Sequence, residues 1–416
     1  VGTELGIPVY HYEAAAKDKK RKNLANCRQG EYEGLSKKLV DPEWKPDFGP
    51  AEFNKSVEKS GVTGVSARDF LVAYNINLNT TSTRRANAVA FDIREAGRIK
   101  REGGTLSGIV MKDEDGNPLK EPGLFKAVKG IGWYIEEYGA AQISYNLTDI
   151  NISPLHEVFD KTCERSIARG MRVTGSELIG LVPKKVLIDA GKHFLKKQER
   201  STGINESEII KIAIKTLGLE ELAPFDPQER IIEYMLENDA NKPLVNMTLT
   251  GFANETASES SAPGGGSIAA YCGAMGISLG TMVANLSAHK RGWDDRWEEF
   301  SNWAEKGMEY QNTLLGLVDE DTNAFNKIMD AFRLPKDTKA DKAKRQDAIQ
   351  TATKYAILTP FKVMETAYHS MEVMKAMAEI GNPNSVTDAG VGALCARTAV
   401  IGAFLNVKIN CGDCTD

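Results

Sequence analysis

The sequence predicts two modules, an α/β module followed by an all-helical one. Between residues 70 and 182, apolar patterning predicts the element order β-α-β-β-α-β, which is that of a ferredoxin-like split βαβ arrangement. After Leu244 the strand pattern is lost. A stretch without charged residues, 260–288, then has the small and apolar composition of a helix packed inside a bundle.

Each element of the α/β module has its own signal. Alternating apolar residues predict the strands, helical apolar spacing predicts the helices, and Gly139 predicts the turn of a hairpin. Ser153 and Pro154 predict a helix start, because proline is favoured at the first helical position. The predicted elements are, in order, strand 70–78, helix 83–96, strands 128–135 and 141–147, helix 154–168, strand 172–182 and a helix that begins at residue 183.

The other segments set the predicted domain boundaries. The chain opens at Val1 in the middle of an element pattern, so residues 1–50 are predicted to be the remnant of an earlier subdomain. The basic run 17–23 is interpreted as a solvated face, and the Gly-, Asp- and Pro-rich insert 103–123 as a mobile surface loop. The predicted domains are the remnant 1–50, a ferredoxin-like subdomain 51–200, a helical linker 201–242 and an all-helical domain 243–416.

Composition excludes several classes of protein. The 416 residues carry a formal net charge of −5, which argues against a nucleic-acid partner but leaves room for a local basic patch that binds a small anion. The uncharged stretch is diluted by Pro263, glycines and serines, so no membrane span is expected. Six scattered cysteines in a long chain without a secretory signal predict reduced thiols and a cytoplasmic location.

A glycine-rich segment opens the uncharged helix. The glycines allow backbone N–H groups to approach an anion closely, and a helix N-terminus favours negative charge. The alternative is a flexible linker in which Ser267 is an ordinary N-cap. Small residues along the following helix favour a loop held by a packed bundle. The candidate binding residues are Gly264, Gly265, Gly266 and Ser267.

Asp321 is the sharpest candidate for acid–base chemistry. The apolar stripe of its helix falls at Leu314, Val318, Phe325, Ile328 and Phe332, and Asp321 occupies the one position missing from that spacing. A carboxyl on the buried face is desolvated, which raises its pKa towards the range useful for general acid–base work. The alternative is a buried Asp that only satisfies a structural network. The adjacent acids at positions 319 and 320 fall off the stripe and are expected to face water.

Other candidates give weaker signals. Ser385 and Asp388 have the spacing of a capping box. Cys411 and Cys414 form a single pair without a second pair or a nearby histidine, so we interpret their spacing as chance. The five histidines show no metal-ligand spacing, and no metal is expected.

The sequence resembles the formimidoyltransferase-cyclodeaminase family over nearly its whole length. The segments similar to the transferase half are 130–134, 141–149, 175–183 and 227–234. Those similar to the cyclodeaminase half are 261–267, 317–321 and 334–336. The resemblance implies transfer of a formimino group from N-formimino-L-glutamate to tetrahydrofolate in histidine degradation. It also implies closure of 5-formiminotetrahydrofolate to 5,10-methenyltetrahydrofolate with release of ammonia.

The resemblance also implies roles for particular residues. The cyclodeaminase carboxylate falls on Asp321. The folate-contacting segment of the transferase falls on residues 49–61, which gives the candidates Gly49, Pro50, Phe53 and Gly61. No histidine here matches the transferase's catalytic one, so the transfer step is expected to be lost in this chain. The anionic tail of a polyglutamated folate would be held by Lys290 and Arg291 or by the glycine-rich loop.

Two alternatives remain open at this point. The helical module also resembles methenyltetrahydrofolate cyclohydrolase, which hydrolyses the methenyl carbon instead of expelling ammonia. The second alternative is a non-catalytic folate-binding protein. The family resemblance further implies a ring-shaped homo-octamer, with folate and formiminoglutamate as small-molecule partners and tetrahydrofolate as a substrate.

Overall fold

The computed structural model of the chain describes residues 1–67, 69–104, 107–237 and 242–414. Residues 238–241 of the predicted linker and the last two residues of the predicted helical domain lie outside the described residues. By contacts the chain divides into two compact units. The first unit comprises residues 1–74, 83–133 and 143–153, and the second comprises residues 75–82, 134–142 and 154–416.

The N-terminal part of the first unit is a small module around a two-stranded parallel sheet. Strand β1 (Val9–His11) pairs with β2 (Thr63–Val65), and the buried side chains of Tyr10, Leu39 and Val57 pack beside them. Its helices are α1 (Gly2–Leu5), α2 (Leu24–Arg28), α3 (Leu35–Lys38) and α4 (Lys55–Ser60). Because β2 completes this sheet, the first module extends past residue 50, where the sequence placed its end.

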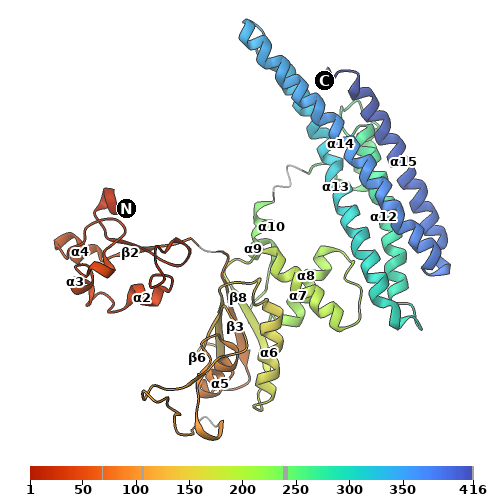
Figure 1. Cartoon of the computed structure of the whole chain (residues 1–416). Coiled ribbons are helices and arrows are strands. Elements are labelled where there is room, and N and C mark those ends of the chain that lie inside the picture. Colours follow the sequence, from red (N-terminus) through yellow and green to blue (C-terminus); the bar gives the residue numbers. More distant parts are fainter. Residues whose placement is uncertain (68, 105–106, 238–241, 415–416) are drawn as a thin grey trace. The chain divides into compact units, whose positions relative to one another are not determined.

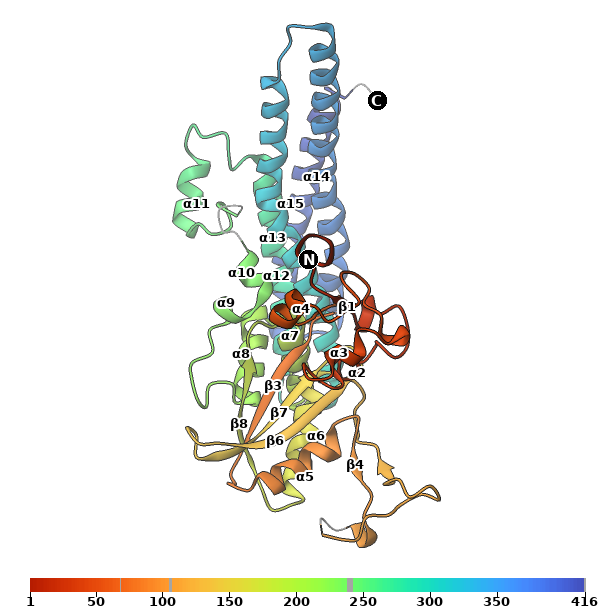
Figure 2. The same ribbon diagram turned by 90° about the vertical axis from the view of Figure 1, so that its left-hand side faces the viewer.

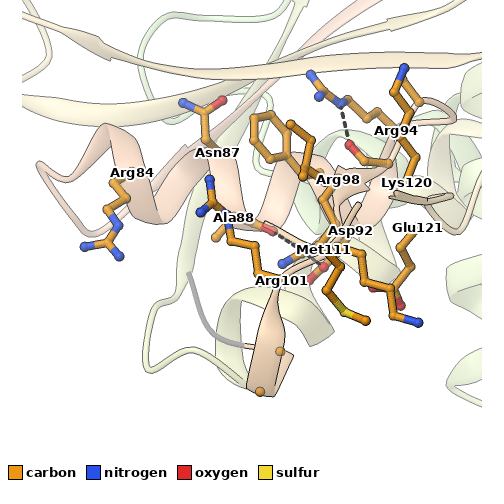
Figure 3. Close-up of a pocket in the computed structure, with 17 residues that line it drawn as sticks. Arg84, Asn87, Ala88, Asp92, Arg94, Arg98, Arg101, Met111, Lys120 and Glu121 are labelled. Carbon is orange, nitrogen blue, oxygen red and sulfur yellow. Dashed lines mark hydrogen bonds and ion pairs between the residues drawn. The ribbon is translucent and has the colours of Figure 1, made fainter. Parts of the chain in front are cut away.

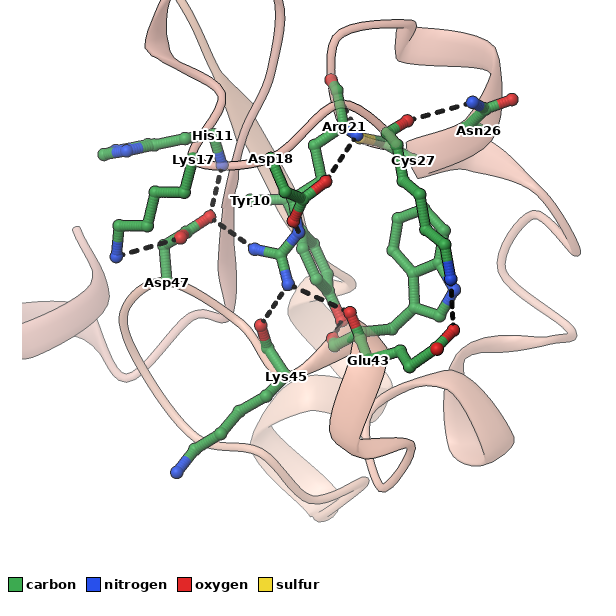
Figure 4. A network of polar contacts seen from close by, with 12 residues as sticks. Tyr10, His11, Lys17, Asp18, Arg21, Asn26, Cys27, Glu43, Lys45 and Asp47 are labelled. Atoms are coloured by element: carbon green, nitrogen blue, oxygen red, sulfur yellow. Dashed lines mark hydrogen bonds and ion pairs between the residues drawn. The ribbon is translucent and has the colours of Figure 1, made fainter.

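Arg21 is the polar centre of this module (Figure 4). Its guanidinium donates to Asp47 Oδ2 at 2.9 Å and to the backbone oxygen of Lys45 at 2.8 Å. The backbone N–H of His11 donates to the same Asp47 oxygen at 2.7 Å. Arg21 is only 6% exposed, so the interpretation of 17–23 as a wholly solvated run is wrong at this residue. A buried guanidinium needs such partners because its charge has been removed from water.

The α/β module contains a four-stranded sheet with the strand order β6-β7-β3-β8. The predicted strands and helices are confirmed, and Gly139 takes the positive φ of a turn residue between β6 and β7. Strand β8 ends three residues earlier than predicted, where Gly180 turns the chain with a φ of 80°. The elements are β3 (Val72–Leu78), α5 (Thr83–Ile93), β6 (Val128–Ile135), β7 (Ala140–Leu147), α6 (Leu155–Ile167), β8 (Val173–Ile179) and α7 (Lys184–Lys197).

The insert predicted as a mobile loop contains paired structure. Strands β4 (Arg98–Ile99) and β5 (Lys120–Glu121) pair antiparallel, and the short 3-10 turn Glu102–Gly104 follows β4. A further bridge joins Arg101 to Val110. We call residues 98–121 the arm, of which 98–104 and 107–121 are described.

Helices α8 (Glu206–Leu217), α9 (Pro227–Arg230) and α10 (Ile232–Leu236) follow α7. The loop between α7 and α8 contacts the helical bundle within the second unit. The backbone N–H of Thr202 donates to Ser301 Oγ at 2.9 Å, and Asn285 Nδ2 donates to the backbone oxygen of Gly203 at 2.8 Å. Thr202 and Ser301 are each 2% exposed, so this contact is part of the interior.

The C-terminal part is helical, as predicted, and among the described residues from 242 to 414 no strand occurs. Four long helices lie side by side in Figures 1 and 2 and share one hydrophobic core. They are α12 (Gly265–Ala288), α13 (Trp297–Arg333), α14 (Lys339–Ile380) and α15 (Val386–Cys411), preceded by the short α11 (Leu249–Thr256).

Glycines allow two of these helices to approach very closely. A Cβ on Gly392 of α15 would lie 2.6 Å from the backbone oxygen of Gly276 on α12, and the reciprocal distance is 2.7 Å. Real Cβ contacts of this length do not occur, so both positions require glycine at this crossing. The uncharged composition of α12 therefore reflects close helix packing.

Two helical segments, Gly265–Ala288 and Pro383–Cys411, are long and apolar enough to cross a membrane by length and composition, which is weak support by itself. The apolar window of the first is 61% buried inside the protein, as expected of a core helix. That of the second is only 22% buried, so α15 presents an uncovered apolar face.

The core face of α13 differs from the predicted stripe. Leu314 and Val318 are fully buried, but Phe325 and Phe332 are 44% and 48% exposed. The buried positions in this part of the helix are instead Leu317, Ala324 and Ala331. Asp321 lies between Leu317 and Ala324 in the same three-and-four spacing, so it remains on the core face.

Candidate functional site: a carboxyl group under a helix N-terminus

Asp321 of α13 lies directly against the first turn of α12. Its Oδ2 accepts a hydrogen bond from the backbone N–H of Ser267 at 3.0 Å and lies 3.3 Å from Ser267 Oγ, which donates to it. Ser267 Oγ also lies 2.8 Å from the backbone oxygen of Val318, so the two helices are fastened at this point. Within the described part of the chain, hydrogen bonds reach only Oδ2, and Oδ1 packs against Gly266.

Burial raises the pKa of the Asp321 carboxyl above its ordinary value. The two hydrogen bonds from Ser267 act in the opposite direction, because they stabilise the charged form, but desolvation is the larger effect. The direction of the shift is the one that the sequence predicts. A carboxyl with a raised pKa exchanges protons more readily near neutral pH than an exposed one does.

Gly266 brings the carboxyl to the helix start. A Cβ on this residue would lie 2.1 Å from Asp321 Oδ1 and 2.5 Å from its Cγ, so no larger residue fits. Close approach therefore requires glycine at position 266, whereas a Cβ on Gly264 would meet nothing within 4 Å. Gly265 is close to a further polar group, since its Cβ would lie 3.4 Å from Nδ2 of Asn406 on α15.

Sequence patterning missed Asn406 and Thr322, because their role depends on which helices meet at the site. Thr322 Oγ1 lies 3.5 Å from Ser267 Oγ. Asn406 and Thr322 could be identified as neighbours of the glycine-rich segment only once it is known that α13 and α15 pack against the start of α12.

Asp319 is not the solvent-facing residue that the sequence predicts. It is 5% exposed, and its oxygens accept the backbone N–H groups of Leu244 at 2.8 Å and Val245 at 3.2 Å. Those donors lie about 75 residues upstream in the sequence, so the helical stripe contained no information on them. Asp319 joins the start of the helical domain to α13.

The predicted capping box of Ser385 and Asp388 is also absent. Ser385 is the N-cap of α15, but its side chain makes no capping hydrogen bond. A short 3-10 turn, Pro383–Ser385, precedes the helix and holds this residue in a buried position. The cap of that turn is Asn382, which accepts from the backbone of Asn384.

The four residues of the transferase folate segment do not form one cluster. Gly49 takes a φ of 84° and packs on the backbone of Ile7, where a Cβ would lie 2.4 Å from the oxygen. Phe53, which follows Pro50 by three residues, makes an edge contact with the ring of Tyr32 at 6.2 Å. Gly61 ends α4 and lines a cavity of about 430 Å³ whose walls include Tyr10, Tyr12 and Tyr32.

A buried polar face on the four-stranded sheet was missed by the sequence analysis. In β3 the buried apolar residues alternate with Asn75 and Asn77, which are 8% and 4% exposed. Gln142 Nε2 donates to Asn77 Oδ1 at 2.7 Å and to Glu177 Oε2 at 2.6 Å. Asn77 donates in turn to Glu221 at 2.9 Å. The alternation of polar and apolar residues in β3 predicts a strand but not the partners of its polar side chains, so this network was not predicted.

No metal centre is suggested by the side chains that the structure describes. Among them no group of three or more His, Cys, Asp or Glu is placed to hold a metal ion. None of the six cysteines, Cys411 and Cys414 included, forms a disulfide.

An α/β module joined to a helical bundle, with a desolvated carboxyl under a glycine-rich helix start, defines the chain as a two-module protein. Three family models match the chain in order. They are the N-terminal subdomain of the formiminotransferase domain at residues 1–68, the formiminotransferase domain at 73–237 and formiminotransferase-cyclodeaminase at 248–416. The chain belongs to the formiminotransferase-cyclodeaminase family.

Curated relatives match both halves together and each half alone. The chain is 40% identical to formimidoyltransferase-cyclodeaminase of Gallus gallus over 414 residues, which are 99% of this chain and 72% of that protein. It is 33% identical to glutamate formimidoyltransferase of Streptococcus pyogenes serotype M1 over 48% of this chain and 57% of that protein. It is 36% identical to methenyltetrahydrofolate cyclohydrolase of Methylorubrum extorquens over 40% of this chain and 79% of that protein.

Proposed function

We propose that the chain is a bifunctional folate enzyme. The first reaction transfers the formimino group of N-formimino-L-glutamate to tetrahydrofolate. The formiminotransferase models at residues 1–68 and 73–237 support it, although the sequence led us to expect its loss. The second closes 5-formiminotetrahydrofolate to 5,10-methenyltetrahydrofolate and releases ammonia. Relatives named for both activities together, matched over 99% of the chain, support this pair of reactions. The observation that carries the second step is the raised pKa of Asp321 beneath the first turn of α12.

The cyclisation needs one proton to move between two nitrogens. The formimino group enters in its protonated form, –CH=NH2⁺. N10 of the folate attacks its carbon and then loses its proton, and the resulting –NH2 nitrogen gains that proton. This nitrogen leaves as ammonia with the electron pair of the C–N bond, and the product is the methenyl cation. Asp321 takes the proton from N10 and returns it to the leaving nitrogen, so the carboxyl ends the cycle as it began. Hydrogen bonds from Ser267 hold Oδ2 of this carboxyl in place. Close packing of the surrounding helices keeps water from the methenyl product.

The candidate folate contacts of this site are Gly264, Gly265, Gly266 and Ser267. The backbone N–H groups of a helix start attract an anionic or strongly polar ligand group, which supports this assignment. For the transferase half we retain Gly49, Pro50, Phe53 and Gly61 as folate contacts. The tyrosine-walled cavity beside Gly61 supports binding of a flat ring there.

We also infer a ferredoxin-like arrangement for the α/β module, which the strand order β6-β7-β3-β8 supports. We further infer a cytoplasmic location, in keeping with six free thiols. The assembly is inferred to be a ring of copies, octameric in the family that the sequence resembles. The uncovered apolar face of α15 supports association of copies.

The test is to assay the chain with 5-formiminotetrahydrofolate, measuring released ammonia and the absorbance of methenyltetrahydrofolate separately. Wild type should form both products in equal amounts, and Asp321→Asn should lower that rate by about 100-fold or more, the scale of a lost general acid–base group. The folded state of the variant is checked by circular dichroism.

The same assay separates the alternatives. Hydrolysis of methenyltetrahydrofolate without ammonia release from the formimino substrate would assign the helical half to cyclohydrolase chemistry. Tight folate binding with no change in absorbance would indicate a non-catalytic folate-binding protein. Full activity of Asp321→Asn would remove the role given to this carboxyl.

A further inference from the structure

A cavity of about 900 Å³ lies between α5 and the arm (Figure 3). Its walls come from α5, from β4 with the turn that follows it, and from β5. These residues are distinct from those around Asp321 and from those that line the tyrosine-walled cavity. Neither proposed reaction uses them.

The cavity is strongly basic. Six cationic side chains and two carboxylates line it, so four positive charges are in excess, whereas the whole chain carries a net charge of −5. A positive cluster in an acidic chain is a local feature, and cations held close together without counter-ions repel each other. The cations are Arg84, Arg94, Lys100, Arg98, Arg101 and Lys120, and the carboxylates are Asp92 and Glu121.

Two of the arginines hold the cavity wall together. Arg94 donates to the backbone oxygens of Gly97 and Gly130, each at 3.1 Å, and its guanidinium lies 3.9 Å from the ring centre of Phe91. Arg98 donates to the backbone oxygen of Ala88 at 2.8 Å and pairs with Asp92. One of the two carboxylates is therefore already engaged, and the wall is fixed by its own contacts.

The other cations are available to a ligand. Among the described residues no polar partner is found for Arg84, Lys100 or Lys120. Arg101 donates one hydrogen bond to the backbone oxygen of Gly108, at 2.9 Å. Because a guanidinium has five N–H donors, Arg101 can also donate to a ligand. Arg84 also lies in the first turn of α5, where the helix dipole disfavours a cation, so helix stability does not explain its presence.

These cations are spread across the cavity. Figure 3 shows Lys120 on the opposite side of the cavity from Arg84, with Arg101 between them in the view. Charges spaced in this way match a chain of anionic groups better than a single ion. Phe91 and Met111 supply apolar wall for the carbon skeleton between such groups.

We propose that this cavity is a binding site for an extended small polyanion, a molecule that carries several phosphate or carboxylate groups in a row. Arginine recognises both kinds of group through paired N–H donors, so the shared chemistry is that of an oligoanion. Described residues of the arm form one wall of the site, and the pairings of Lys120 with Ile99 and of Arg101 with Val110 hold these two cations in place.

The test is isothermal titration of the full chain with tripolyphosphate and, separately, with a linear tetraglutamate peptide. At least one probe should bind, and its affinity should fall as ionic strength rises, because the contacts are ionic. Binding of tripolyphosphate alone assigns the site to phosphate groups, and binding of tetraglutamate alone assigns it to carboxylates. The double variant Arg84→Glu/Arg101→Glu should weaken that binding about 100-fold, or about tenfold for each lost charged contact.

The matched control is Lys19→Glu/Lys22→Glu, which makes the same change in net charge at two exposed residues of the N-terminal module. It should leave the affinity within about twofold of wild type. Arg84→Gln/Arg101→Gln repeats the test without charge reversal if the first variant does not fold. Absence of binding by both probes, or equal weakening by the control pair, would overturn the proposal.

Discussion

The carboxyl group of Asp321 makes the folded protein less stable at neutral pH than a neutral side chain of the same shape would. Desolvation raises its pKa in the folded state, so the charged form is disfavoured there relative to the unfolded chain. Its contribution to stability is complete below the ordinary pKa of an aspartate and is lost as the pH rises through the raised folded value. A proton-transfer residue therefore carries a cost in folding free energy.

Asp321→Asn should accordingly melt at the same temperature as wild type or higher at neutral pH. The advantage of the variant should shrink on acidification towards the ordinary aspartate pKa, about 4, because wild type is then protonated too. Differential scanning calorimetry across this range measures the trend. A variant that is less stable than wild type at neutral pH would contradict the desolvation argument. Asp319→Asn provides the contrast, since it loses an acceptor for two buried N–H groups and should cost about 1–3 kcal/mol.

The difference between these two neighbouring acids shows where reading the sequence reached its limit. Asp321 could be found from the spacing of α13, because a helix places every third or fourth residue on one face. The burial of Asp319 could not, because its partners, the N–H groups of Leu244 and Val245, come from a segment far away in the chain. Arg21 was hidden for the same reason, since Asp47 and the backbone of Lys45 bury it from a distance in sequence.

At the scale of elements, the presence and the order of the helices were predictable from the sequence. Which side of each helix faces the core was not. The sequence placed the large side chains of Phe325 and Phe332 in the core of α13, whereas Ala324 and Ala331 are buried there. Large apolar residues usually mark a buried face, but closely packed helices need small ones at their contacts. The same preference for small residues brings Gly276 and Gly392 together in the crossing of α12 and α15.

Two glycines of α15 test this packing. Gly392→Ala should destabilise the helical domain by about 1–3 kcal/mol, because the new methyl group would overlap the backbone of Gly276. Gly390→Ala, two residues earlier in the same helix, should stabilise it by about 0.5–1 kcal/mol, because nothing lies within 4 Å of its Cβ position and alanine favours a helix. Chemical denaturation of both variants measures the two effects. Equal effects at both positions would mean that the close crossing does not exist in solution.

At the scale of the whole molecule, α15 has an apolar face that its own chain leaves uncovered, since only 22% of its apolar window is buried. The apolar side chains that it exposes by 43% or more are Val386, Val391, Leu394, Ile401, Phe404, Leu405 and Ile409. Five of them recur at spacings of three, four or seven residues and so lie on one face of the helix, namely Val391, Leu394, Ile401, Leu405 and Ile409. An apolar stripe of this length is typical of a surface that a second copy covers.

Leu394→Arg should therefore reduce the mass of the assembly in sedimentation or light scattering, because a charge would have to be buried in an apolar contact. Asn384→Arg adds the same charge at an exposed polar residue just before α15 and should leave the mass unchanged. If wild type is already a monomer at working concentrations, the proposed association fails. Co-sedimentation of wild type with lipid vesicles would instead identify the stripe as a membrane contact.

The loop between α7 and α8 has a practical consequence for anyone who wants to separate the halves. Relatives that match one half alone suggest a cut near residue 240. Such a cut would expose an interior contact of the second unit, where the backbone N–H of Thr202 donates to Ser301 and Asn285 donates to the backbone oxygen of Gly203. A Cβ on Gly203 would lie only 2.2 Å from the backbone of Ala304, so the loop between α7 and α8 packs closely on α13. A helical half produced by itself would expose the surface of α12 and α13 that the loop between α7 and α8 covers. We expect a short peptide that spans residues 201–205 to bind to that exposed surface.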